Sequence, residues 1–88
     1  MKKRKVRNRL LELIQERERK RGRRIILRDI AEFVDVSDHT ITNWIRNNVT
    51  RFDSKLIEGL CDYFDCDVSD LLYFEWIETG QSSEEVNE

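Results

Sequence analysis

The sequence contains no proline, three glycines and no apolar run approaching the length of about 20 residues that a membrane span requires. The apolar residues after the basic start are too interrupted for a secretory signal, because residues 6–14 include Arg7, Asn8, Arg9 and Glu12. The 88 residues are enough for about one small domain. We therefore expect a soluble, cytoplasmic, all-α domain that has no membrane partner.

Cysteine and histidine are also scarce. The two cysteines, Cys61 and Cys66, are too few for the disulfide framework of a small secreted protein. With one histidine and no second cysteine pair, they do not match a zinc pattern, and their apolar helical positions favour buried, reduced thiols. The sequence shows no nucleophile–base pair, metal-ligand set, phosphate-binding loop or ligand-sensing segment, so we expect no enzymatic activity, cofactor or small-molecule ligand.

The net charge of -2 conceals a strong separation of charge along the chain. Residues 1–28 hold 13 basic and 3 acidic residues, a net charge of +10. Residues 29–88 hold 3 basic and 15 acidic residues, a net charge of -12. Such asymmetry is typical of a chain with a basic surface for nucleic acid or membrane, but a solvated helix followed by an acidic tail gives the same pattern.

The first expected helix is amphipathic and ends at a glycine. Its apolar stripe recurs at i, i+4, i+7 and i+8, and comprises Val6, Leu10, Leu13 and Ile14. Gly22 is placed to end this helix. Residues 1–5 (MKKRK) would precede the domain as a basic arm that either lies on DNA, adding salt-dependent affinity, or is simply solvated.

Four shorter helices are expected after the first. Two would cover residues 28–34 and 38–47, with Ser37 as the N-cap of the second. The others would begin after Asp53, an N-cap candidate, and after Asp67, which forms a capping box with Asp70. The sequence therefore predicts an all-α fold, a compact bundle of about five helices.

The domain is expected to span residues 6–78. The last helix would carry Leu71 and Leu72 and extend over residues 73–77. Residues 79–88 (TGQSSEEVNE) are polar and acidic, and we expect them to form a disordered tail.

The two central helices have the spacing of a helix-turn-helix unit, whose second helix can enter a major groove. Such a unit needs a small residue where its helices cross and an apolar residue in the turn, and Ala31 and Val36 supply these. Ile41 and Trp44 stand where the second helix must be apolar, which favours a core position for Trp44 over a stacking platform. The opposite face is polar and comprises Asp38, His39, Thr42, Asn43 and Arg46.

Two segments resemble the lambda-repressor/Cro-like (XRE) family of DNA-binding domains. LRDIAEFVDVSDHTITNWI is similar to the family's helix-turn-helix core, and LCDYFDCDVSDLL to the ending of its small single-domain members. The resemblance covers roughly residues 6–74 and implies a bundle of about five helices whose third helix contacts DNA bases. Asp35 replaces the usual turn glycine, and Asp tolerates the positive φ of that position at modest cost. Leu27 replaces a phosphate-binding glutamine, so Arg28 is the expected substitute.

We expect base contacts from the polar face of the third helix. Asn43 could bond adenine through two hydrogen bonds, and Thr42 could meet a base edge or a thymine methyl group. His39 could contact DNA or be an exposed turn residue. Asp38 could accept a hydrogen bond from cytosine N4, but a role in supporting the helix N-terminus is favoured. Phosphate contacts are expected from Arg28, Ser37, Arg46 and Arg51.

The sequence thus predicts a sequence-specific transcription regulator that binds double-stranded DNA. Repression would follow from docking residues 38–47 in a major groove and blocking the polymerase. The alternative is a protein-interaction module, an antitoxin or anti-repressor, that uses the acidic C-terminal half as its partner surface. The apolar residues near the end would either close the core over the first helix or form a homodimer contact; they are Tyr73, Phe74, Trp76 and Ile77.

Overall fold

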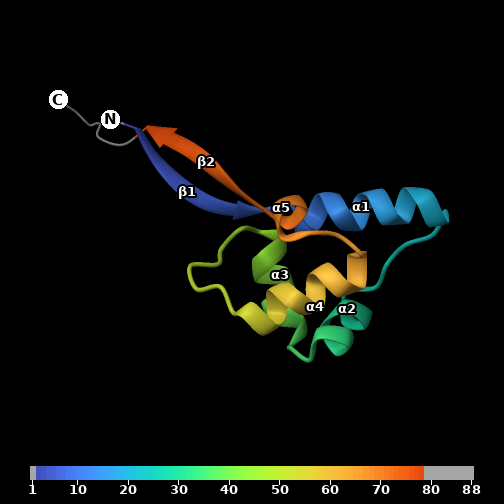
Figure 1. The fold of residues 1–88 in the computed structure, drawn as a ribbon. Helices are drawn as coiled ribbons and strands as arrows, with labels where there is room; N and C mark the ends of the chain where they lie inside the picture. The colour runs from blue at the N-terminus through green and yellow to red at the C-terminus, as the bar shows by residue number, and fades with distance from the viewer. Residues whose placement is uncertain (1, 79–88) are drawn as a thin grey trace.

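The computed structural model, which describes residues 2–78, consists of a helical body and a two-stranded ribbon that projects from it (Figure 1). The elements are β1 (Lys2–Asn8), α1 (Leu10–Arg21), α2 (Leu27–Val34), α3 (Asp38–Ile45), α4 (Ser54–Phe64), α5 (Val68–Leu71) and β2 (Leu72–Glu78). The fold therefore combines five helices with an antiparallel sheet, and the all-α prediction is wrong. The expected tail, residues 79–88, lies outside the described residues.

The ribbon joins the two ends of the described chain. β1 and β2 are antiparallel, with Lys2 opposite Glu78 at the tip and Asn8 opposite Leu72 at the base. β2 (LYFEWIE) is rich in aromatic residues, which favour strands. The sequence predicts a helix for residues 73–77, and this prediction is wrong. The strand that pairs with them lies at the other end of the sequence, so no local hairpin signal indicates the pairing. Val6, predicted for the apolar stripe of the first helix, lies instead in β1.

The helix boundaries follow local sequence signals. α1 ends where Gly22 adopts a left-handed conformation with φ of 71°, as predicted. The predicted N-caps are confirmed at Ser37 for α3 and at Asp53 for α4, where each side chain accepts a backbone hydrogen bond. Asp67 and Asp70 form the predicted capping box of α5. The polar sequence between the apolar stripes is therefore enough to position four of the helix ends.

The core lies where the helices of the body meet. Its buried residues come from all five helices and are Leu10, Ile14, Ile30, Ala31, Ile41, Trp44, Leu56, Leu60, Phe64 and Leu71. α2 and α4 approach closely because Gly59 faces Val34: a Cβ atom on Gly59 would lie 2.7 Å from Val34 Cγ1. Between residues 2 and 78, no helix has both the length and the apolar character to cross a bilayer.

Candidate nucleic-acid interface

The centre of the candidate interface is the pair α2 and α3 with the turn between them. Ala31 and Ile41 are buried at 1% and 0% exposure, and Val36 packs against the same core from the turn. Asp35 ends α2 in the left-handed conformation, with φ of 61°. The turn is held by the Val36 N–H, which donates to the Ala31 carbonyl at 2.9 Å. Asp35 therefore adopts the left-handed backbone geometry that glycine adopts most readily.

α3 divides into a core face and an outer face. Ile41 and Trp44 face the core, and Trp44 is only 2% exposed. The polar residues recur at helical spacing on the opposite side, and they are Asp38, His39, Thr42, Asn43 and Arg46 at the C-cap. Thr42 and Asn43 are half-buried, whereas His39 is exposed. The helix thus presents hydrogen-bonding side chains outward from a rigid apolar support.

Three hydroxyl groups at the N-cap and in α3 already have partners within this segment. Ser37 Oγ accepts from the Thr40 N–H at 3.2 Å and lies 3.0 Å from Thr40 Oγ1. Thr42 Oγ1 donates to the Asp38 carbonyl at 3.1 Å. Because the Thr42 hydroxyl hydrogen points back along the helix, Thr42 offers its methyl group and the oxygen lone pairs to an outside partner.

The basic residues predicted to contact phosphates come from separate elements. Arg28 lies in the first turn of α2, Arg46 caps the end of α3, and Arg51 lies in the connection to α4. Arg28, Arg46 and Arg51 are all exposed. Arg28, Arg46 and Arg51 therefore stand at three points around the helix-turn-helix, where their charges are accessible to a polyanion.

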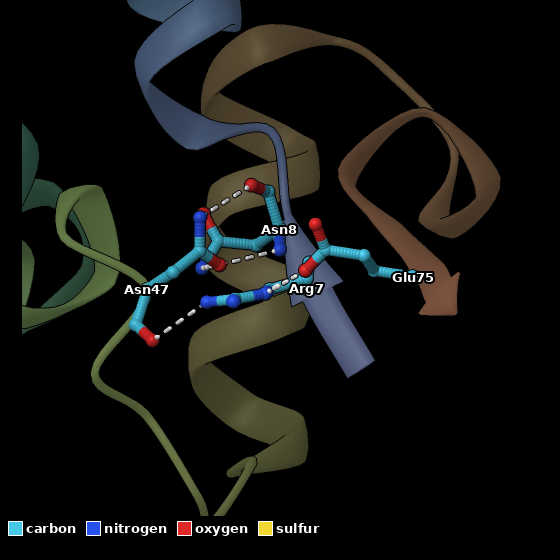
Figure 2. Close-up of polar contacts among 4 residues, drawn as sticks. All are labelled: Arg7, Asn8, Asn47 and Glu75. Carbon is cyan, nitrogen blue, oxygen red and sulfur yellow. Dashed lines mark hydrogen bonds and ion pairs between the residues drawn. The ribbon is translucent and has the colours of Figure 1, made fainter. Parts of the chain in front are cut away.

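The sequence did not reveal a polar joint between the ribbon and the end of α3 (Figure 2). Asn8, which is 5% exposed, donates from Nδ2 to the Trp44 carbonyl at 2.9 Å and to Asn47 Oδ1 at 3.0 Å. Asn47 follows α3 with φ of 58°, a left-handed conformation that asparagine adopts more readily than most residues. The pair Asn47–Asn48 marks the end of the helix in the sequence, but nothing local indicates its distant partner.

Arg7 strengthens the same joint. Its Nε donates to Glu75 Oε1 across the ribbon, and its Nη1 lies 3.5 Å from the Asn47 carbonyl oxygen. Figure 2 shows this guanidinium group lying between the carboxylate of β2 and the backbone after α3. β1, β2 and α3 are therefore linked by one charged side chain as well as by the asparagine pair.

Cys61, in the last turn of α4, and Cys66, two residues after the helix, are free and half-buried. Burial raises the pKa of the Cys66 thiol from its ordinary 9.0 to about 11. Burial also raises the pKa of the Cys61 thiol, against a lowering by its hydrogen bond with Cys66. Both thiols are therefore neutral at physiological pH, as suits side chains that pack against the core.

Comparison with known proteins identifies the family. The Cro/C1-type HTH DNA-binding domain family matches residues 9–75, which extend from the residue before α1 into β2 and include the whole helix-turn-helix. Neither the curated proteins nor the solved structures gave a match. The resemblance inferred from the two sequence segments is confirmed, and the chain belongs to the Cro/C1-type helix-turn-helix DNA-binding domain family.

Proposed function

We propose that this protein represses transcription by binding a specific double-stranded DNA sequence through α3. The main observation that supports this proposal is the division of α3 into a buried face, with Ile41 and Trp44, and an outward polar face. A helix supported in this way fits a major groove about 12 Å wide, where each base pair has a distinct hydrogen-bonding pattern. Bound at a promoter, the domain would exclude the polymerase.

Three residues on the outer face of α3 are the proposed base contacts. Asn43 supplies an amide that can donate to and accept from one adenine. Thr42, whose hydroxyl hydrogen is held by the Asp38 carbonyl, is suited to contact a thymine methyl group. His39, one turn before Asn43 and exposed, can reach a base edge near the start of the helix. Together they give α3 the means to distinguish sequences.

Phosphate contacts would position α3 in the groove without adding sequence information. We assign these contacts to Arg28, Arg46 and Arg51, because all three are exposed on segments within or directly after the helix-turn-helix. Ser37 is proposed as a further contact at the start of α3, although its Oγ also caps the helix. Each arginine that neutralises a phosphate should add to the salt dependence of binding.

We also propose that the protein binds DNA as a homodimer formed through β2. Phe74 and Trp76 are 59% and 62% exposed on a two-stranded ribbon, which is marginally stable when isolated. β1 carries five basic residues, so pairing between two copies of β1 would bring like charges together. Pairing β2 with β2 of a second copy keeps the basic strands apart and closes the assembly by a two-fold axis.

Selection from a pool of random DNA duplexes tests the proposed function. One sequence should be enriched, and Asn43→Ala should weaken its binding by roughly 10- to 100-fold while relaxing the preference at one position. Arg46→Ala should weaken all duplexes about equally and reduce the salt slope by about 1. Glu58→Ala, on exposed α4 surface, is the control. Binding with no enriched sequence and no salt dependence would contradict the proposal.

Two further measurements test repression and dimerisation. A reporter whose promoter contains the selected sequence should be repressed by the wild-type protein and not by Asn43→Ala; an unchanged reporter contradicts repression. Sedimentation equilibrium should give a dimer for the wild type and a weaker one for Trp76→Ser. A monomer at every concentration would contradict the proposed dimer. The selection experiment would still test whether the monomer binds DNA.

A further inference from the structure

The ribbon has two faces with different chemistry. Residues directly opposite in an antiparallel pair share a face, and neighbours along a strand alternate between faces. The first face comprises Lys2, Arg4 and Val6 with Phe74, Trp76 and Glu78. The second face comprises Lys3, Lys5 and Arg7 with Tyr73, Glu75 and Ile77. Between residues 2 and 5, each face carries two basic residues, but the surroundings of these charges differ between the faces.

On the first face, the basic side chains lie against groups of the ribbon itself. The Arg4 guanidinium lies 5.0 Å from the centre of the Phe74 ring and 5.5 Å from the centre of the Trp76 ring. These are cation–π distances, at which the ring faces attract the charge. Lys2 stands directly opposite Glu78, an acidic partner across the sheet. This face carries two aromatic rings, and each of its basic side chains has a partner on the ribbon.

On the second face, two lysines are held outward without such balance. Lys3 stands opposite the uncharged Ile77, and Lys5 stands opposite Glu75. The Glu75 carboxylate already accepts a hydrogen bond from Arg7 Nε. Lys3 and Lys5 are both exposed, and strand geometry places them about 7 Å apart along β1. This face is therefore a short row of accessible positive charge.

The position of this row relative to α3 is set by the polar joint. Arg7 is the inner end of the row, and its Nη1 lies 3.5 Å from the carbonyl oxygen of Asn47, the residue after Arg46. The Asn8 N–H donates to Asn47 Oδ1 at 2.8 Å, which holds the base of β1 on the end of α3 (Figure 2). The positive row thus begins at Asn47, the residue after the proposed phosphate contact Arg46, and extends outward along the ribbon (Figure 1).

We propose that Lys3 and Lys5 form a second DNA-binding surface, which contacts the phosphate backbone beside the major groove that α3 enters. Asn8 and Asn47 are positioning residues that fix the angle between this surface and α3. The inference rests on the proposed function of α3 and extends it to the ribbon. Because the lysines lie on a paired strand and not on a flexible arm, binding would lose little backbone entropy.

A charge-matched pair of variants tests the surface. Lys3→Ala with Lys5→Ala removes two charges from the second face, and Lys2→Ala with Arg4→Ala removes two from the first face of the same strand. On the selected duplex, we expect the first variant to reduce the slope of log affinity against log salt by about 0.9 for each phosphate that the protein no longer neutralises, and the second to change it little. Equal slopes for the two variants, with both folded by circular dichroism, would overturn the proposal.

Asn47→Gly tests the positioning role. Glycine adopts the left-handed backbone of this position and removes the side-chain bonds to Asn8. In this background the loss of affinity caused by removing Lys3 and Lys5 should shrink, because the ribbon is no longer held against α3. An undiminished loss would overturn the role of the joint. If Asn43→Ala weakens binding while the variants of the two ribbon faces have equal salt slopes, the proposed ribbon surface is wrong and the proposed function of α3 stands. If no duplex is selected, both proposals are wrong.

Discussion

Asn8 and Asn47 form reciprocal hydrogen bonds, in which each residue donates to the other. The backbone N–H and Nδ2 of Asn8 donate to Asn47 Oδ1 at 2.8 and 3.0 Å, and Asn47 Nδ2 donates to the Asn8 carbonyl at 3.3 Å. Asn8 Oδ1 also accepts from the Leu10 N–H at 3.0 Å, at the start of α1. The end of β1, the start of α1 and the end of α3 therefore meet at one buried amide.

Substitutions of Asn47 should separate the contribution of its side chain from that of its backbone. Asn47→Gly should lower the free energy of unfolding by about 1–3 kcal/mol through the removal of its side-chain hydrogen bonds. Asn47→Ala should lower it by about 1 kcal/mol more, because the φ of 58° is unfavourable for alanine. Urea denaturation followed by circular dichroism measures both. Equal stability of the two variants would show that the left-handed backbone is not maintained.

Asp35 should be replaceable by glycine with a gain in stability. Its φ of 61° is the conformation that glycine adopts without a Cβ penalty. We expect Asp35→Gly to raise the free energy of unfolding by about 0.5–1 kcal/mol and Asp35→Ala to lower it by about 1 kcal/mol. Thermal denaturation of the three proteins gives the order. A glycine variant less stable than the alanine variant would contradict this explanation of the turn.

Gly59 should be required by the close packing of α4 on α2. Glycine inside a helix costs about 1 kcal/mol relative to alanine, so replacing a glycine by alanine at an exposed helix position stabilises the protein. Here the new Cβ would lie 2.7 Å from Val34 Cγ1, and we expect a loss of about 1–3 kcal/mol. In a Val34→Ala background, the same substitution should become neutral or stabilising. A double-mutant cycle by chemical denaturation with no coupling between the two sites would refute the contact.

The cysteine thiols should react slowly in the folded protein. Since burial raises the pKa of Cys66 to about 11, little thiolate is present at pH 8, and iodoacetamide should modify the folded protein much more slowly than the unfolded one. With Cys61 replaced by alanine, the rate at Cys66 should still rise only at a pH above 9.0, because burial, the largest cause of the raised pKa of this thiol, remains. A raised thiol pKa in the folded state stabilises the protein below pH 9.0, and this stabilisation is lost as the pH rises towards 11. If the rate of modification at Cys66 reached half its maximum below pH 9, the burial of this thiol would be contradicted.

The sequence predicts well those features whose causes are local. Ser37, Asp53 and Gly22 mark helix ends through their own side chains or backbone preferences, and the structure has helix ends there. Ala31 and Trp44 lie in the core because of helical spacing, which a window of a few turns reveals. The outward polar face of α3 follows from the same periodicity.

Features that depend on distant partners were not predicted. Val6 fits the spacing of a helical stripe, but its neighbours pair with β2 and take it into a strand. Phe74 and Trp76 alternate as strand residues should, yet a short apolar stretch after a helix fits a helical continuation equally well. Asn8 gave no signal at all, because an asparagine in a charged segment is usually solvated, and its partner Asn47 is far along the chain.

The ribbon has a consequence for how the protein is made. Within the domain, β1 is synthesised before the five helices and β2 after them, so β1 has no partner strand until almost the whole domain exists. Contacts between such distant segments require closure of a long loop and form slowly compared with contacts inside helices. The helical body can therefore assemble while β1 is still single. The Arg7–Glu75 ion pair and the paired ribbon that carries the basic row form only after β2 has been released.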